Sequence, residues 1–308
     1  MPHHDKSLKV SGFTESIEQD LMHIQISCRK PVNELLASEY HSSFKGRGLD
    51  FDELREYQAG DDVRLIDWNV TARLGHPHIK RFVEERELSL FLLVDFSASQ
   101  SFGSVEKVKQ RALAELCALL ALAAKKNNDK VALIIFTDEV ELYLPPGKGT
   151  NHVTRIIAEL LSFEPKSKKT DLNVALDFVG HITSKSSLVF LVSDFISDNY
   201  QDALMMIAQR HDFIAVAVTD PLELNFTDCG LTQLRDLETD ATTVVDTGSL
   251  HFQKRFNALA QQEAKALSNW FLESGIDHFS LHTDEDIAIQ LMHFFKMRER
   301  RQSGESGG

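Results

Sequence analysis

The 308-residue sequence has few cysteines, no long apolar run and no excess of basic residues. Cys28, Cys117 and Cys229 form no Cys-x-x-Cys pair, which excludes a disulfide framework or a zinc cage of the usual spacing. The most apolar stretches, residues 88–94 and 116–124, are far shorter than the roughly 20 residues that span a bilayer. The first residues lack the apolar core of a signal peptide, and the net charge of −13 disfavours generic nucleic-acid binding. We therefore expect a cytoplasmic protein.

From residue 88 onward, short apolar runs alternate with longer stretches of helical periodicity. Four of these runs show no alternation of apolar and polar residues: 88–94, 131–136, 187–192 and 213–218. Continuous apolar runs are typical of strands that are buried on both faces of a parallel sheet covered by helices. The pattern predicts an α/β domain over residues 88–297 with a doubly wound, mostly parallel sheet. A three-residue link between 131–136 and 140–144 predicts a hairpin.

Two segments flank the predicted domain. Residues 1–44 carry helical periodicity, and residues 46–87 hold 7 Lys and Arg and 10 Asp and Glu side chains. Residues 1–87 are therefore expected to form an N-terminal helical arm with a charged hairpin that packs on the main domain. The last residues, 298–308, have no apolar anchor, which predicts a disordered tail.

Oxygen-bearing side chains follow the predicted strands. Asp95, Ser97 and Ser99 come at alternate positions after the first strand, Asp194 follows the strand at 187–192, and Thr170 precedes a helix. In an open parallel sheet, ligands bind beyond the carboxyl ends of the strands, where the strand order switches direction. Hydroxyls and carboxylates suit Mg²⁺ or Mn²⁺. The alternative is purely structural, with the serines and aspartates acting as caps of helix N-termini.

The order Asp-x-Ser-x-Ser, then Thr, then Asp resembles the metal-ion-dependent adhesion site (MIDAS) of von Willebrand factor A domains. The resemblance implies that Asp95, Ser97, Ser99, Thr170 and Asp194 hold a divalent cation, Mg²⁺ or Mn²⁺. It also implies a von Willebrand factor A-like fold and metal-bridged binding of other proteins, without covalent chemistry.

The segment before the first strand is similar to a bacterial family, the domain-of-unknown-function family fifty-eight. The features that match are Gly46, Gly48, Phe51, Arg55, Tyr57, Gly60-Asp61-Asp62, Arg64, Ile66-Asp67-Trp68, Ala72-Arg73 and Glu85-Arg86. The resemblance covers about residues 30–295, and one departure is Gln100, where the family commonly has Met. Members are typically encoded beside MoxR-type AAA+ ATPases. The resemblance therefore implies an adaptor or co-chaperone whose partners are such an ATPase and client proteins.

The charges of this segment require partners if they are buried. Arg55, Arg64 and Arg73 are expected to pair with Asp61, Asp62 or Asp67. Two roles stay open, packing on the domain or docking of a partner. The candidate docking residues are Arg55, Tyr57, Asp61, Asp62, Arg64, Asp67, Trp68 and Arg73.

Enzyme families fit the strand-end motif less well. A haloacid-dehalogenase-like phosphatase needs a second Asp where Ser97 stands, and an α/β-hydrolase needs glycines around its serine. Residues 145–152 resemble a phosphate loop only faintly, because Leu142 stands where its first glycine belongs and Gly149 stands where Ser or Thr should follow Lys148. The leading hypothesis is a binding protein and not an enzyme. The competing one is a metal-dependent, phosphatase-like hydrolase that uses Asp95 and Asp194, for which no general base is identifiable.

Overall fold

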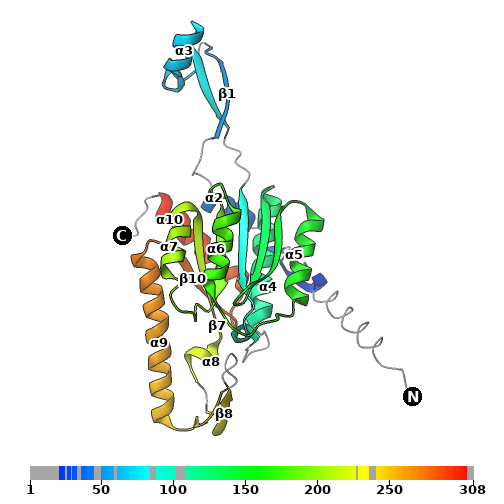
Figure 1. Cartoon of the computed structure of the whole chain (residues 1–308), viewed down its shortest axis with the longest axis vertical. Coiled ribbons are helices and arrows are strands. Elements are labelled where there is room, and N and C mark those ends of the chain that lie inside the picture. The colour runs from blue at the N-terminus through cyan, green and yellow to red at the C-terminus, as the bar shows by residue number, and fades with distance from the viewer. Residues whose placement is uncertain are drawn as a thin grey trace, which may run out of the picture. The chain divides into compact units, whose positions relative to one another are not determined.

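The computed structural model describes residues 21–24, 26–28, 30–32, 36–44, 50–58, 61–83, 88–101, 109–226, 228–235 and 241–303 (Figure 1). The chain divides into two compact units. One comprises Met1–Ser43 together with Ser89–Gly308, and the other comprises Phe44–Leu88.

The larger unit is built on a six-stranded sheet in the order β10-β7-β6-β3-β4-β5. Its strands are β3 (Ser89–Asp95), β4 (Lys130–Phe136), β5 (Val140–Gly147), β6 (Leu188–Ser193), β7 (Asp212–Thr219) and β10 (Asp277–His282). All neighbours pair in parallel except the β4–β5 hairpin. Counted along the chain, this order is 3-2-1-4-5-6, which is a doubly wound arrangement. The predicted fold class and the predicted hairpin are both confirmed.

Helices cover both faces of this sheet (Figure 1). They are α4 (Lys109–Lys126), α5 (Thr150–Ser162), α6 (Leu172–Ile182), α7 (Gln201–Arg210), α9 (Leu250–Glu273) and α10 (Ile287–Ser303). On one face, Phe91 and Leu93 of β3 share an apolar cluster with α6, α7 and Phe271 near the end of α9. On the other face, α4 contacts β3 and β4, and α5 and α10 contact α4. Burial from both sides explains why the central strands carry no alternation.

An extension lies between β7 and the last strand. It consists of α8 (Pro221–Leu224), the antiparallel pair β8 (Leu231–Arg235) and β9 (Thr242–Asp246), and α9. Of the 24 residues of α9, Phe271 alone is buried, because most of this helix runs beyond the sheet (Figure 1). Within the described ranges, none of the helices combines the length and apolarity that a membrane crossing needs.

The C-terminal helix extends further than the sequence suggested. Residues 298–308 were expected to be a disordered tail, but α10 continues to Ser303. The reason is Arg298, which is buried and pairs with Asp212 at the start of β7 and Asp277 at the start of β10. Residues 304–308 lie outside the described part of the chain.

The smaller unit contains the charged segment. Its elements are β1 (Asp50–Glu56), η2 (Val63–Leu65), α3 (Trp68–Leu74) and β2 (His78–Val83), and β1 pairs antiparallel with β2. Asp67 caps α3 by accepting from two backbone N–H groups, and Gly75 ends the helix with a φ of 79°, where glycine is favoured. The expected arm of residues 1–87 is thus divided between the two units, and its packing on the main domain stays a prediction.

Candidate functional site

The switch point of the sheet lies between β3 and β6, where the strand order reverses. β3 ends at Asp95 and β6 ends at Ser193, and the two strands are parallel neighbours. The hydroxyl of Ser193 donates a hydrogen bond of 2.7 Å to Oδ2 of Asp95, and both residues are fully buried. Two strand-end motifs that are 98 residues apart in the sequence therefore meet at one point.

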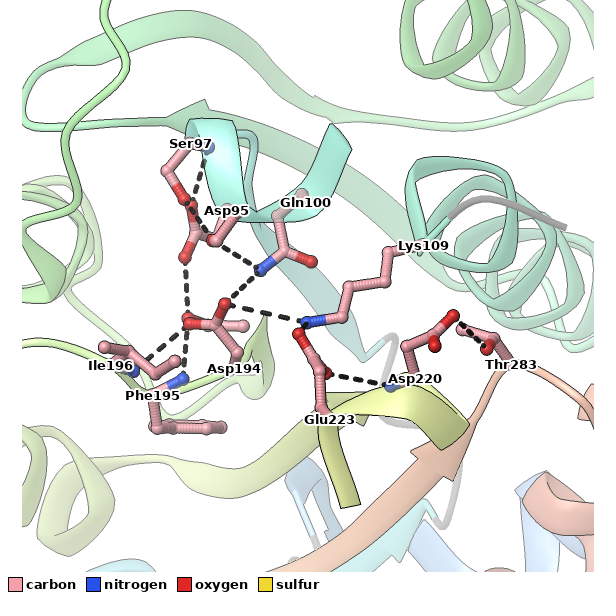
Figure 2. A network of polar contacts seen from close by, with 12 residues as sticks. Asp95, Ser97, Gln100, Lys109, Asp194, Phe195, Ile196, Asp220, Glu223 and Thr283 are labelled. Carbon is pink, nitrogen blue, oxygen red and sulfur yellow. Dashed lines mark hydrogen bonds and ion pairs between the residues drawn. The ribbon is translucent and has the colours of Figure 1, made fainter. Parts of the chain in front are cut away.

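Asp95 also organises the turn that follows β3. Its Oδ1 accepts a hydrogen bond of 2.8 Å from the backbone N–H of Ser97 (Figure 2). The Oγ atoms of Ser97 and Ser99 lie 3.0 Å apart. The alternating spacing of Asp95, Ser97 and Ser99 thus brings one carboxylate and two hydroxyls into a single cluster, as the sequence predicted.

Asp194 joins this cluster from β6. Its Oδ2 accepts a hydrogen bond of 3.1 Å from Nε2 of Gln100, and its Oδ1 accepts one of 3.1 Å from the backbone N–H of Ile196 (Figure 2). Nε2 of Gln100 also lies 3.5 Å from Oγ of Ser99. Gln100, which departs from the residue common in the family, therefore links the two halves of the site.

The turn that carries Asp194 is held in an unusual conformation. Phe195 has a φ of 60°, a value that non-glycine residues rarely adopt and that persists where the surroundings enforce it. Its ring packs against Phe271 of α9 and Tyr200, with ring centroids 5.1 and 5.9 Å away. Its backbone N–H donates to Oγ of Ser193. The aromatic contacts and this hydrogen bond together fix the direction of Asp194.

The loop that contains Thr170 lies next to the Asp95 turn. The carbonyl of Lys168 accepts a hydrogen bond of 3.1 Å from the backbone N–H of Ala98, and Asp171 caps α6. The carboxylate of Glu141 holds the same loop by accepting from the backbone N–H of Lys166. The backbone thus brings the Thr170 segment to the site. The role of the Thr170 hydroxyl as a ligand stays a prediction.

Burial and mutual repulsion govern the charge of the site. Burial, together with the neighbouring charge of Asp194, raises the pKa of Asp95 to about 6. The hydrogen bonds from Ser193 and Ser97 act in the opposite direction, because they stabilise the carboxylate. A positive charge placed between the two carboxylates would relieve this repulsion.

A buried lysine that sequence reasoning missed completes the site. Lys109 of α4 is fully buried, and its Nζ lies 2.6 Å from Oε1 of Glu223 in α8 and 3.8 Å from Oδ2 of Asp194 (Figure 2). A signal was present in the sequence. Lys109 lies three and four residues before Ala112 and Leu113, on the buried stripe of the helix, where a lysine requires a charged partner.

The oxygen atoms gathered here fit a hard divalent cation such as Mg²⁺ or Mn²⁺. The described residues contain no cage of three or more His, Cys, Asp or Glu side chains, so a cation at this point depends on hydroxyls as well as on carboxylates. Oε1 of Gln100 is buried and has no hydrogen-bond partner in the described part of the protein. Such an oxygen is costly to leave unsatisfied, and a cation or its water would satisfy it.

The smaller unit holds the candidate docking residues. Arg55 donates two hydrogen bonds to Asp61, at 2.9 and 2.7 Å, and these bonds lower the pKa of Asp61. Arg64 pairs with Asp62 at 3.5 Å, with both side chains largely exposed. Two of the expected pairings are thus confirmed, whereas Asp67 serves as the cap of α3.

Apolar side chains are exposed on the same unit. Trp68 is 69% exposed, and Val63 and Leu74 are exposed to a similar extent. Arg73 is also exposed, and the backbone N–H of Tyr57 donates to the carbonyl of Pro77. A tryptophan with this exposure makes little packing contribution within its own unit and is common at protein interfaces.

Comparison with known proteins gives uncharacterised relatives of similar length. The chain is 27% identical over 282 residues to an uncharacterised protein of Mycobacterium tuberculosis, Rv1480, and to one of Mycobacterium bovis, Mb1516. Each alignment covers 90% of this chain and 88% of the relative. A shorter protein of Mycobacterium avium, MAV169, is 25% identical over half of the chain and 94% of its own length.

Among solved structures, an aerotolerance-related membrane protein from Bacteroides fragilis matches 70% of this chain and 99% of its own, with a TM-score of 0.46 and 15% identity. BatB from Bacteroides thetaiotaomicron matches 71% of this chain and 100% of its own, with a TM-score of 0.45 and 14% identity. A family model described as "Protein of unknown function DUF58" matches residues 53–266. The chain therefore belongs to the DUF58 family.

Proposed function

We propose that this chain is a metal-dependent protein-binding module, with a divalent cation, Mg²⁺ or Mn²⁺, held by Asp95, Ser97, Ser99, Thr170 and Asp194. The observation that carries the proposal is the convergence of four of these residues at the switch point of the sheet, where burial and the charge of Asp194 raise the pKa of Asp95. A bound cation would supply positive charge and an open coordination position for an oxygen atom of a partner protein.

The chemistry of the donors supports a partner with an acidic side chain. Hydroxyl ligands such as Ser97 and Ser99 are neutral, so they leave positive charge on a cation for a further anionic ligand. The neighbouring loop carries three exposed lysines, Lys166, Lys168 and Lys169. Their charges would attract an acidic segment toward this edge of the sheet.

We further propose that the module is an adaptor or co-chaperone that links a MoxR-type AAA+ ATPase to client proteins. An adaptor needs two interaction surfaces, and the chain offers two candidates. One is the edge with Asp95 and Asp194, and the other is the exposed surface of the smaller unit around Val63, Trp68 and Leu74. The ATPase is assigned to the smaller unit and the client to the edge of the sheet.

Cation binding is tested first, by calorimetric titration of Mg²⁺ and Mn²⁺ into the wild type and two variants. Asp95→Ala should abolish binding, because it removes a buried carboxylate of the site. Asp198→Ala is the matched control, since Asp198 is exposed and lies four residues after Asp194 on the same loop. Equal binding by the wild type and Asp95→Ala would refute the site.

Partner binding is tested by affinity capture with and without chelator, using a purified MoxR-type ATPase from the same organism. The proposal predicts that Trp68→Ala loses the ATPase but binds the cation normally. It also predicts that Asp95→Ala and chelator release acidic clients but leave the ATPase bound. Retention of the ATPase by Trp68→Ala would remove the smaller unit from the proposed interface.

The same variants separate binding from hydrolysis. If the site were a phosphatase-like hydrolase, the wild type with Mg²⁺ would turn over p-nitrophenyl phosphate and Asp95→Ala would not. Both carboxylate oxygens of Asp95 accept hydrogen bonds, from Ser97 and Ser193, which supports a fixed ligand in preference to a nucleophile. Turnover that is lost in Asp95→Ala would replace the binding proposal with the hydrolase.

A further inference from the structure

The ammonium group of Lys109 lies between the candidate cation site and α8. It is 2.6 Å from Glu223 and 3.8 Å from Asp194, and the side chain of Lys109 has no exposed surface (Figure 2). A buried ammonium is costly unless it is paired, so Lys109 must stay close to at least one of these carboxylates. In the present arrangement Glu223 is the closer partner and Asp194 the more distant one.

The charges around Lys109 are not balanced within the described network. Asp194 and Glu223 share the one ammonium, and the charge of Asp194 also acts on the buried carboxyl group of Asp95. A divalent cation near Asp194 would attract this carboxylate and repel Lys109, because like charges a few ångströms apart repel strongly in a site of low dielectric. Glu223 is the group that can take up the displaced ammonium.

We infer that Lys109 is a positioning residue that couples cation occupancy at Asp194 to the conformation of α8 through Glu223. This inference rests on the proposed cation site and adds to it a link that the proposed function does not contain. With the site empty, Lys109 is shared between Asp194 and Glu223. With the site filled, it is held by Glu223.

Glu223 carries the link into α8 by using both of its carboxylate oxygens. While Oε1 binds Lys109, Oε2 accepts a hydrogen bond of 2.9 Å from the backbone N–H of Asp220, which forms a capping box with Asp220 as the N-cap of α8. Asp220 in turn accepts a bond of 3.4 Å from Thr283, at the end of β10. A change in the Lys109 contact therefore acts on the cap of α8.

α8 joins the central sheet to the extension formed by β8, β9 and α9. The helix connects β7 to the β8–β9 hairpin and contacts α9, the elements that extend beyond the sheet (Figure 1). A cation bound at Asp194 would thus alter how α8 anchors the extension to the sheet. By reciprocity, a partner bound to the extension would change the cation affinity.

The first test is a double-mutant cycle on Lys109 and Glu223 with Mn²⁺ affinity as the readout. Glu223→Gln should weaken Mn²⁺ binding by about ten-fold, because Lys109 then compensates Asp194 alone. Lys109→Met should tighten it by about ten-fold, because the competing ammonium is gone. In the Lys109→Met background, Glu223→Gln should change the affinity less than about three-fold, since the link is already broken.

Two outcomes of the cycle would overturn the link. An equal effect of Glu223→Gln in both backgrounds would show that Glu223 acts as a distant charge, independently of Lys109. No effect in either background would show that the pair is structural only. Asp198→Asn is the matched control, and removal of this exposed charge on the Asp194 loop should leave the affinity within about two-fold. Lys109→Gln replaces Lys109→Met if the latter does not fold.

The second test separates this inference from the cation proposal. In chelator, hydrogen exchange of the backbone amides of residues 220–225 should be several-fold faster in Lys109→Met and Glu223→Gln than in the wild type. In the wild type, Mn²⁺ should slow this exchange. If the wild type binds no cation, the proposed function fails, but faster exchange in Lys109→Met would still uphold the contact with α8. Unchanged exchange in both variants would overturn the link.

Discussion

The two edges of the central sheet each contain a buried basic side chain between two acids, but they differ in charge balance. At the amino edge, Arg298 pairs with Asp212 at 2.5 Å and with Asp277 at 3.2 Å, and Arg301 pairs with Asp277. Two arginines therefore face two aspartates. The charges of this cluster balance, and its ion pairs hold α10 against β7 and β10.

At the carboxyl edge, the single ammonium of Lys109 is shared by Asp194 and Glu223, with Asp95 close by, among the residues that the structure describes. Negative charge is in excess, and burial raises the pKa of Asp95 to about 6. The contrast teaches that a buried ion pair by itself does not identify a functional site. A local excess of one charge is a better indication of one, because it leaves an electrostatic cost that a ligand can relieve.

The largest change in stability is expected from a substitution at the amino edge, where the charges balance. Arg298→Met should destabilise the protein by about 3 kcal/mol, because it leaves the partly buried Asp212 without its arginine and Asp277 with only the exposed Arg301. Urea unfolding measures the loss, with Arg301→Met as the control, since Arg301 is 59% exposed and should contribute little. A loss below about 1 kcal/mol in Arg298→Met would mean that the ion pairs of Arg298 contribute less to stability than their geometry indicates.

At the unbalanced edge, adding a cation should stabilise the protein. A ligand at a hundred times its Kd stabilises the folded state by about 2.7 kcal/mol. Mg²⁺ affinity should fall as the pH drops through about 6, because Asp95 takes up a proton there. Thermal unfolding with and without Mg²⁺ at several pH values checks both effects. A pH-independent shift in Tm would place the cation elsewhere.

The smallest change in stability is expected for Asp95→Asn, which should stabilise the protein, whereas Arg298→Met destabilises it. A pKa raised to about 6 means that Asp95 contributes stability below about pH 4 that is lost as the pH rises through about 6. Asp95→Asn removes this loss and should stabilise the cation-free protein at neutral pH by about 2 kcal/mol. The difference in unfolding free energy between the variant and the wild type, measured in chelator, should vanish near pH 4. A destabilised Asp95→Asn at neutral pH would erase the contrast between the two edges.

Much of the fold and part of the site could be predicted from the sequence. Continuous apolar runs mark strands buried on both faces, and parallel strands align their carboxyl ends, so the meeting of Asp95 and Asp194 followed from the strand pattern. Local spacing alone brought Ser97 and Ser99 together.

The rest depended on contacts between distant segments. Lys109 and Glu223 meet because α4 and the α8 turn after β7 converge at the same edge, which no local pattern reports. Arg298 was assigned to a tail on composition, although its partner Asp212 lies 86 residues earlier. Gln100 was no candidate site residue, but its amide reaches a carboxylate 94 residues later in the chain. Only the folded chain makes these partners adjacent.

The turn at Phe195 places two demands on a single position. The backbone there requires a left-handed conformation, which glycine and asparagine adopt with the least strain. The packing against Phe271 and Tyr200 requires an aromatic ring, which neither residue has. Substitution of Phe195 by glycine would release the Asp194 loop from α9. Substitution by leucine would keep an apolar side chain of similar bulk, but it would lose the ring contacts and leave the backbone strain in place. Position 195 should therefore be among the positions of the chain that tolerate substitution least in a saturation screen for binding, although its side chain bears no charge and has no atom that could ligate a metal.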